Sequence, residues 1–242
     1  MPLISVSGTQ CIGKSTFIQD FMAQWPMYKT SSKSYRDIIK DKNLTINQET
    51  TKESQRLILE SIVEDIKNAK KDEYWIFDRS PLDNLVYSIW SYDKNKSDID
   101  EDFIADCIKI ARLAIQKLDV MFFIPITKQN DIELEDDGIR DIDPIYRREI
   151  NELFMGLKQK RENNDDTFFV KDDSPPIIEI FGGRTERISL CQLYIKENGD
   201  FFGEEESLLL DANGDYINAD SAQEIDTGER DRLRKHLGLD KM

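Results

Sequence analysis

A glycine-rich segment near the start of the chain has residue types and a spacing that suit the binding of phosphate groups. It matches the pattern G-x-x-x-x-G-K-[ST] at each fixed position, follows a short apolar run and precedes a helix-like stretch, which is the context that the pattern requires. Glycines let successive backbone N–H groups turn toward phosphate oxygens, and the following helix adds the positive end of its dipole. The sequence therefore predicts a nucleotide site formed by Gly8, Thr9, Gln10, Cys11, Ile12, Gly13, Lys14, Ser15 and Thr16.

Two side chains of this segment have separate expected roles. Lys14 should reach the β- and γ-phosphates of a nucleotide, and Ser15 should ligate Mg²⁺. An ordinary glycine turn between a strand and a helix is the alternative, but that alternative does not account for a Lys-Ser pair directly after the second glycine. ATP and Mg²⁺ are accordingly the expected cofactors.

A second motif follows the apolar run 74–77, where Asp78, Arg79 and Ser80 stand in succession. Ligands of open α/β sheets lie beyond the carboxyl ends of the strands, so Asp78 and Arg79 should project toward the same crevice as the glycine-rich segment. The carboxylate could hold a water on Mg²⁺ or accept a proton from an attacking hydroxyl, and the guanidinium could bridge phosphate oxygens. A helix N-cap at Ser80, with local pairing of Asp78 and Arg79, is an alternative that is compatible with catalysis. The two motifs together indicate phosphoryl transfer.

The elements that must position these motifs alternate over about three quarters of the chain. Apolar runs predict strands at 2–7, 74–77, 119–125 and 167–171. Helical periodicity predicts helices at 14–25, 35–39, 50–69, 81–90, 102–118 and 144–160. The stretch 127–143 is too polar and acidic to belong to a core. This alternation predicts an α/β fold with a parallel sheet flanked by helices.

The character of the sequence changes beyond about residue 183. Apolar segments at 188–195 and 208–210 are followed by Asn-Gly turn signals, which favour antiparallel hairpins. The segment 188–195 could equally form a last helix that packs on the core. We expect residues 1–183 to form the core, with a lid around 127–148, and residues 184–242 to form a small appendage, with β structure as one option, and a charged helical tail.

Composition restricts the partners. The 242 residues carry 33 basic and 48 acidic side chains, a formal charge of −15, so a long nucleic acid would be repelled unless a local basic cleft overrides the net charge. Cys11, Cys107 and Cys191 show no metal-ligand spacing, and no apolar leader or long apolar span is present. We expect a cytoplasmic protein without a membrane partner that acts on small phosphorylated ligands; the pattern does not define an oligomeric state.

The glycine-rich segment, the run Asp-Arg-Ser-Pro-Leu-Asp at 78–83 and the segments 137–140 and 143–149 together resemble the P-loop kinase-like ATPases, which include nucleoside and nucleotide kinases. The sequence is most similar to compact AAA-type kinase-like domains of bacterial and phage proteins, which also resemble the ribosylnicotinamide kinase domain. The resemblance covers about residues 2–172 and implies a P-loop NTPase fold. In the deoxynucleoside and thymidylate kinase branches an acidic-arginine pair at the strand end acts on the acceptor, a role that carries over to Asp78 and Arg79.

The same resemblance implies a lid whose arginines close over ATP. That role carries over to Arg140, and then to Arg147 and Arg148, which face different sides of one helix, so that at most one should reach the site. A solvated helix start with local ion pairs is the alternative. The acidic character of the lid and the C-terminal appendage both depart from the family pattern and leave the substrate open.

Acceptor recognition is assigned to residues that flank the expected crevice. An aromatic side chain can stack on a base and a glutamine can read the edge of a base, which makes Gln55 and Tyr87 candidates, and Arg36 could meet an acceptor phosphate. A core or surface position is the alternative for each. The expected function is Mg²⁺-dependent phosphoryl transfer from ATP to a hydroxyl or phosphate of a nucleoside, nucleotide or related small molecule. A kinase acting on DNA or a modified DNA base, and a nucleotide-dependent switch or binding module, are the alternatives.

Overall fold

The computed structural model describes residues 1–31, 35–42, 44–127, 143–164, 174–202, 209–210 and 216–217. Five parallel strands form its main sheet in the order β2-β3-β1-β4-β5. Their bounds are β1 (Leu3–Ser7), β2 (Tyr28–Lys29), β3 (Tyr74–Asp78), β4 (Val120–Phe123) and β5 (Ile177–Glu179). The predicted α/β architecture with a parallel sheet is therefore confirmed.

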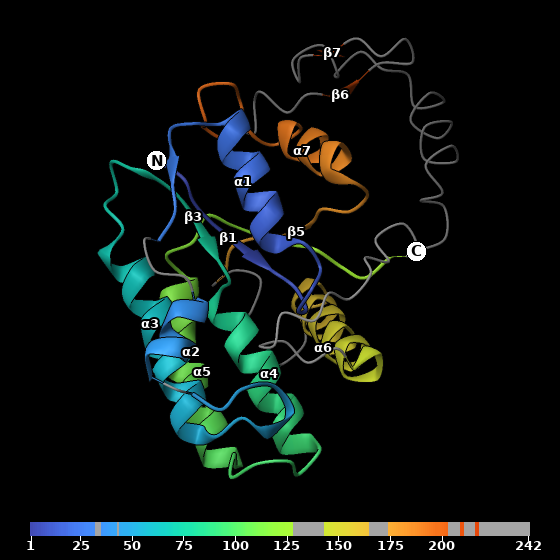
Figure 1. Ribbon diagram of the computed structural model, residues 1–242. Coiled ribbons are helices and arrows are strands. Elements are labelled where there is room, and N and C mark those ends of the chain that lie inside the picture. Colours follow the sequence, from blue (N-terminus) through green and yellow to red (C-terminus); the bar gives the residue numbers. More distant parts are fainter. Residues whose placement is uncertain are drawn as a thin grey trace.

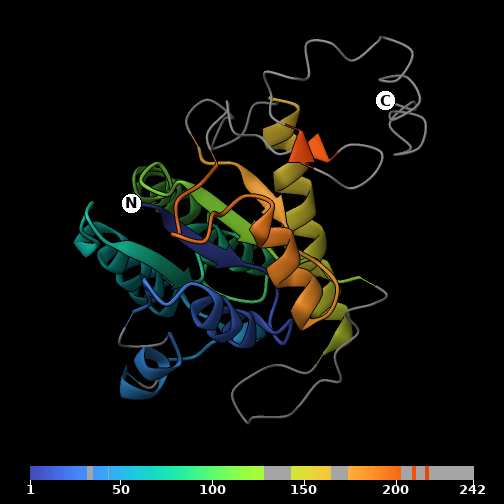
Figure 2. The same cartoon turned by 90° about the horizontal axis from the view of Figure 1, so that it is seen from above.

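Helices cover both faces of this sheet (Figures 1 and 2). One face carries α1 (Lys14–Gln24) and α7 (Arg184–Gln192), which contact each other. The opposite face carries α3 (Lys52–Asn68), α4 (Pro81–Asp93), α5 (Glu101–Ile115) and α6 (Pro144–Glu162). The shorter α2 (Tyr35–Lys42) contacts α3, and a 3-10 turn, η1 (Asn47–Glu49), contacts α4. None of the helices in these described ranges is long and apolar enough to cross a membrane.

Side chains of the central strand alternate between two apolar cores. Leu3 of β1 packs beneath α3, α4, α5 and α6, whereas Ile4 and Val6 pack with α1 and α7. This alternation follows from the twofold repeat of a strand, which sends successive side chains to opposite faces. Both faces are covered, so the strand is apolar or small throughout, as is typical of parallel sheets.

The elements at 2–7, 14–25, 35–39, 50–69, 74–77, 81–90, 102–118, 119–125 and 144–160 are confirmed to within a few residues at their ends. The strand predicted at 167–171 lies outside the described residues, and the fifth strand is instead β5. The two-residue β2 was also not predicted. Both strands are too short to show a periodic pattern in the sequence.

Residues 188–192 of the segment 188–195 belong to helix α7, so the alternative of a last helix that packs on the core is confirmed and the alternative of a hairpin strand is wrong. Helix α7 buries Cys191 in the same core as β1, and the Asn198-Gly199 turn that follows is closed by an antiparallel bridge between Ile195 and Phe201. Trp25 Nε1 donates to Lys196 O at 2.8 Å and the Tyr28 hydroxyl donates to Gly199 O at 2.7 Å. Farther on, β6 (Leu209–Leu210) pairs antiparallel with β7 (Tyr216–Ile217). The division of the chain at residue 183 stays a prediction, although α7 and this turn pack directly on the core.

An aromatic cluster between α1 and the sheet gives a direct test of the core. The ring of Phe21 is fully buried and its centroid lies 4.6 Å from that of Trp25 and 5.0 Å from that of Tyr28. We expect Phe21→Ala to lower the free energy of unfolding by about 3 to 5 kcal/mol, because it removes buried area and leaves a cavity. Denaturant unfolding measures this, with Leu113→Ala as the control because Leu113 is 66% exposed. Equal stability of the two variants would contradict the packing described.

Candidate active site

The glycine-rich loop between β1 and α1 needs its glycines for two steric reasons. Gly8 has a φ of +143°, and a Cβ atom there would lie 2.7 Å from the carbonyl oxygen of Ile124. Gly13 has a φ of +83° and stands directly before the first residue of α1. Cys11 also adopts a positive φ, +55°, without being glycine. Such a conformation costs free energy for a non-glycine residue, so the surrounding contacts must hold the loop in this shape.

Lys14 is folded onto this loop. Its Nζ atom donates hydrogen bonds to Gly8 O at 2.6 Å and to Thr9 O at 2.7 Å, and the side chain is buried. Helix α1 begins at the same residue, so the first N–H groups of the helix have no acceptor within it. A fixed ammonium and a set of helix N–H donors therefore lie together, an arrangement that suits a polyphosphate.

The two sequence motifs meet through Ser15 and Asp78. Ser15 Oγ donates to Asp78 Oδ2 at 3.2 Å across 63 residues of chain. A hydroxyl oxygen and a carboxylate oxygen are the ligand types that Mg²⁺ takes from proteins. No cluster of three or more His, Cys, Asp or Glu side chains that could hold a metal occurs among the described residues. This pair therefore fits a Mg²⁺ ion that keeps waters and phosphate oxygens as its other ligands, which is how Mg²⁺ usually binds beside nucleotides.

The end of β3 is fixed by a capped helix start. Ser80 Oγ accepts from Leu82 N and Asp83 Oδ2 accepts from Ser80 N, which together form a capping box at the start of α4. Ser7 and Ser80 hydroxyls hydrogen-bond at 2.8 Å, so the ends of β1 and β3 are joined. Arg79, which stands between the last residue of β3 and the N-cap Ser80, has a φ of +88°. The predicted N-cap at Ser80 is confirmed, and it coexists with the placement of Asp78 at the glycine-rich loop.

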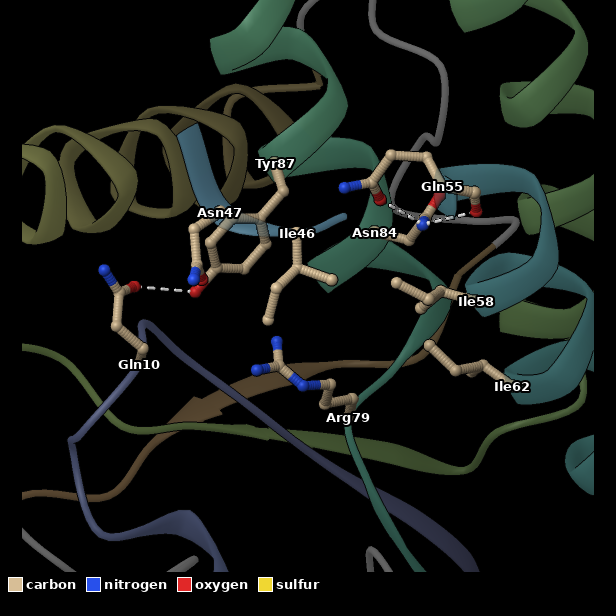
Figure 3. Close-up of a pocket in the computed structure, with 9 residues that line it drawn as sticks. All are labelled: Gln10, Ile46, Asn47, Gln55, Ile58, Ile62, Arg79, Asn84 and Tyr87. Atoms are coloured by element: carbon tan, nitrogen blue, oxygen red, sulfur yellow. Dashed lines mark hydrogen bonds between the residues drawn. The ribbon is translucent and has the colours of Figure 1, made fainter. Parts of the chain in front are cut away.

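Arg79 lies in a pocket next to the loop (Figure 3). Its guanidinium stands 5.5 Å from the ring centroid of Tyr87, and its Nη1 atom lies 3.6 Å from Asp83 Oδ1. The Tyr87 hydroxyl donates to Gln10 Oε1 at 2.8 Å, which connects the pocket to the glycine-rich loop. The space inside the pocket, including the part open to solvent, amounts to about 430 Å³. Its lining residues are Gln10, Ile46, Asn47, Gln55, Ile58, Ile62, Arg79, Asn84 and Tyr87.

The far end of this pocket is polar. Asn84 Nδ2 donates to Gln55 Oε1 at 2.6 Å and to Gln55 O at 2.9 Å (Figure 3). Gln55 Nε2 in turn donates to Thr50 Oγ1 at 2.9 Å. Among the described residues, the buried Asn84 Oδ1 and Gln10 Nε2 atoms have no hydrogen-bond partner. Buried polar atoms nearly always have partners in native proteins, so the unpartnered Asn84 Oδ1 marks hydrogen-bonding capacity at this end of the pocket.

The first turn of α6 contacts both the loop and the pocket wall. Thr9 Oγ1 donates to Arg147 O at 3.2 Å, and Arg147 Nη2 donates to Cys11 O at 3.3 Å. Asp143 caps the helix by accepting from Ile145 N and Tyr146 N, and it also accepts from Gln48 Nε2 at 3.1 Å. The backbone N–H groups hold the pKa of Asp143 below its usual range. Asp143 is therefore charged at neutral pH, which suits its position at a helix start.

The structure thus brings together the glycine-rich loop, Asp78, Arg79, Gln55, Tyr87 and Arg147. Arg148 is exposed on α6. Arg140 lies outside the described residues, as does the side chain of Arg36. Thr16 is exposed on α1. Trp90 of α4 is buried, its ring meets that of Tyr146 edge-on with the centroids 4.4 Å apart, and its Nε1 atom donates to Glu149 Oε2 at 2.8 Å.

Two residues that contact the pocket or the glycine-rich loop were not predicted from the sequence. Asn84 could have been found as a polar residue on the apolar face of the helix 81–90, one turn beyond Ser80. Arg187 donates from α7 to Ile12 O at 3.0 Å, inside the glycine-rich loop. No local pattern marks it, because its contact spans 175 residues of chain.

The strand order and the loop between β1 and α1 define a P-loop fold of the kinase type. Two deoxyadenosine kinase structures from M. mycoides share it: one with dCMP and dCDP (TM-score 0.58, 18% identity) and one with bound dATP (TM-score 0.53, 18% identity). In each comparison the alignment covers 78% of this chain and 96% of the kinase. A NadR protein in complex with NR gives a TM-score of 0.52 at 14% identity over 74% of this chain. The chain spans only 45% of the length of that NadR protein.

The sequence itself assigns the family. A family model described as an AAA domain matches residues 3–168, more than half of the chain, so the protein belongs to this family. A comparison with curated proteins gave no match. The resemblance to P-loop kinase-like domains inferred from the sequence is confirmed at the level of family and fold.

The steric constraint on Gly8 generates a prediction with a built-in control. Gly8→Ala should lower the melting temperature and abolish ATP binding, because the added Cβ would meet Ile124 O at 2.7 Å. Gly156→Ala has no atom within 4 Å of its Cβ and lies inside α6. We expect it to raise the free energy of unfolding by about 0.5 to 1 kcal/mol through helix propensity. Thermal unfolding and nucleotide titration measure both variants, and normal ATP binding by Gly8→Ala would refute the constraint.

Proposed function

We propose that the protein is a kinase that transfers a phosphoryl group from ATP to a hydroxyl or phosphate of a nucleoside, nucleotide or related small molecule, with Mg²⁺ as cofactor. The observation that carries this proposal is the hydrogen bond between Ser15 and Asp78 beside the pocket that holds Arg79. The glycine-rich loop, the two oxygen atoms of this hydrogen bond and the pocket lie next to one another, and this proximity supports the proposal. Phosphoryl transfer needs such positioning more than it needs covalent chemistry.

Each side chain has a role that follows from its place. Lys14 would follow the β- and γ-phosphates, and the N–H groups of residues 13–16 would bind their oxygens. Ser15 and Asp78 would hold Mg²⁺, Asp78 through a water, and the ion would neutralise charge on the phosphate oxygens. Asp78 is also the residue able to accept the proton of the acceptor hydroxyl. Arg79 would clamp the acceptor or the transferring phosphoryl group, and Arg140 would add a second cation when the lid closes.

The pocket beside Arg79 suits a nucleoside. Ile46, Ile58 and Ile62 supply an apolar wall for a flat base, and Tyr87 supplies an aromatic ring. The Gln55 and Asn84 amides supply hydrogen-bonding groups at the far end of the pocket. Relatives of similar fold have nucleosides or nucleotides bound, namely NR, dCMP and dATP. These features support a nucleoside-like acceptor and leave its base open.

Mass spectrometry tests the proposal directly. The protein is incubated with Mg·ATP and, one at a time, with nucleosides, nucleotides, nicotinamide riboside and DNA, and each product is examined for the mass of one added phosphoryl group. We expect a gain on a small acceptor with the wild type and none with Lys14→Ala. Phosphorylation of DNA alone would favour the polynucleotide alternative. ATP binding without any phosphorylated product, combined with nucleotide-controlled binding of a protein, would favour a switch.

Removal of the Asp78 charge should slow the reaction while the protein still binds ATP. Asp78→Asn keeps the size of the side chain but removes the negative charge needed to accept a proton or to hold a water firmly on Mg²⁺, so we expect kcat to fall about a hundredfold or more with a modest change in ATP affinity. Arg79→Ala should instead raise the KM of the acceptor more than that of ATP. Steady-state kinetics with both substrates varied measures these effects, with Asp72→Asn at an exposed position as control. A near-normal kcat for Asp78→Asn would remove Asp78 from the mechanism.

A further inference from the structure

Two arginines from distant helices hold successive carbonyl groups of the glycine-rich loop. Arg147 of α6 donates to Cys11 O at 3.3 Å, and Arg187 of α7 donates through Nη1 to Ile12 O at 3.0 Å. Both side chains are buried. Neither arginine lies near the loop in sequence, so the fold places both guanidinium groups on it from α6 and α7.

A hydrogen bond to a carbonyl orients the whole peptide unit. The unit is planar and trans, so its C=O and its N–H point in opposite directions. A guanidinium that holds Ile12 O outward therefore turns the Gly13 N–H toward the other side of the loop, and one that holds Cys11 O does the same for the Ile12 N–H. These are the N–H groups that a bound phosphate would use. Donation to the carbonyl also polarises the peptide and strengthens its N–H as a donor.

Arg187 donates to a second carbonyl group besides that of Ile12. Its Nε atom donates to Gly182 O at 3.1 Å, so a single planar group bridges the loop and the turn before α7. Both acceptors are neutral carbonyls, and among the described residues Arg187 makes no ion pair. Burial lowers the pKa of Arg187, but a guanidinium stays charged at neutral pH. A buried charge without a counter-ion is costly, and a bound polyphosphate would supply the missing negative charge.

We infer that Arg187 is a positioning residue of the nucleotide site, which orients the peptide units of the glycine-rich loop for phosphate binding and adds a buried positive charge behind them. The inference rests on the proposed function, because it assumes that this loop binds a nucleotide. It makes α7, at 184–192, part of the phosphate site. Arg147 performs the corresponding orientation for the preceding peptide.

The test compares charge and geometry at one position. Arg187→Gln removes the charge and keeps one donor, whereas Arg187→Lys keeps the charge but loses the planar fork that reaches two carbonyls. Arg184→Gln is the matched control, since Arg184 lies on the same helix, pairs with Asp20 and has a side chain that is 74% exposed. Titration calorimetry measures the affinity of each variant for Mg·ATP and for inorganic tripolyphosphate, a probe that has no base. Thermal unfolding without ligand measures stability.

We expect Arg187→Gln to weaken tripolyphosphate and Mg·ATP binding by a similar factor of about ten or more, because a unit charge near a phosphate is lost in a partly buried site. Arg187→Lys should recover part of this loss, and Arg184→Gln should bind as the wild type does. A purely structural role would lower the melting temperature of Arg187→Gln while leaving the affinity of the folded protein unchanged. Wild-type tripolyphosphate affinity in folded Arg187→Gln would overturn the inference.

Two further outcomes complete the test. If Arg187→Gln does not fold, Arg187→Lys decides alone, and wild-type affinity in that variant overturns the inference. Lys14→Ala separates this inference from the proposed function. Binding lost in Lys14→Ala but retained in Arg187→Gln rejects only the role of Arg187, whereas wild-type binding in Lys14→Ala rejects the nucleotide site itself.

Discussion

The parallel pairing of β1 with β3 is the constraint on which the candidate site depends. Its register places Val6 opposite Asp78, and the Arg79 N–H donates to Val6 O at 3.0 Å. The glycine-rich loop leaves β1 directly after this point, and the acidic-arginine pair ends β3 at the same edge of the sheet. A shift of one residue would send Asp78 to the opposite face, because strand side chains alternate. The register, fixed by apolar residues on both faces, therefore brings Ser15 to Asp78.

Much of this could be predicted from the sequence, because the information is local. The glycine-rich motif specifies backbone geometry through Gly8 and Gly13, and the long helices show their period directly. The capping box at Ser80 is likewise encoded within four residues. The positions of β2 and β5 could not be predicted, since strands of two and three residues owe their existence to a neighbouring strand rather than to their own pattern.

The long-range contacts that assemble the site could not be predicted from the sequence. No sequence pattern shows that Arg187 contacts the glycine-rich loop, since it stands in an amphipathic helix where an arginine is ordinarily solvated. The sequence left a hairpin strand and a helix open at 188–195 for a related reason. An eight-residue apolar segment next to an Asn-Gly turn fits a strand or a helix, and only its packing against α1 decides. Asn84 is similar, because its place in the pocket depends on a hydrogen bond that it donates to Gln55 Oε1 on a different helix.

Helix α6 relates the two halves of the site to each other. Arg147 and Asp143 at its start form hydrogen bonds with Thr9 and Cys11 in the glycine-rich loop and with Gln48 beside the pocket wall. The distance between the loop and η1 is therefore fixed through one helical turn rather than through the sheet. Farther along the same helix, Glu149 accepts from Trp90 and pairs with Lys94, and both contacts hold the pKa of Glu149 below its usual range. These bonds join α6 to α4, the helix that carries Asn84 and Tyr87. The glycine-rich loop and the pocket are thus both held by α6, so their spacing depends on how α6 packs against α4.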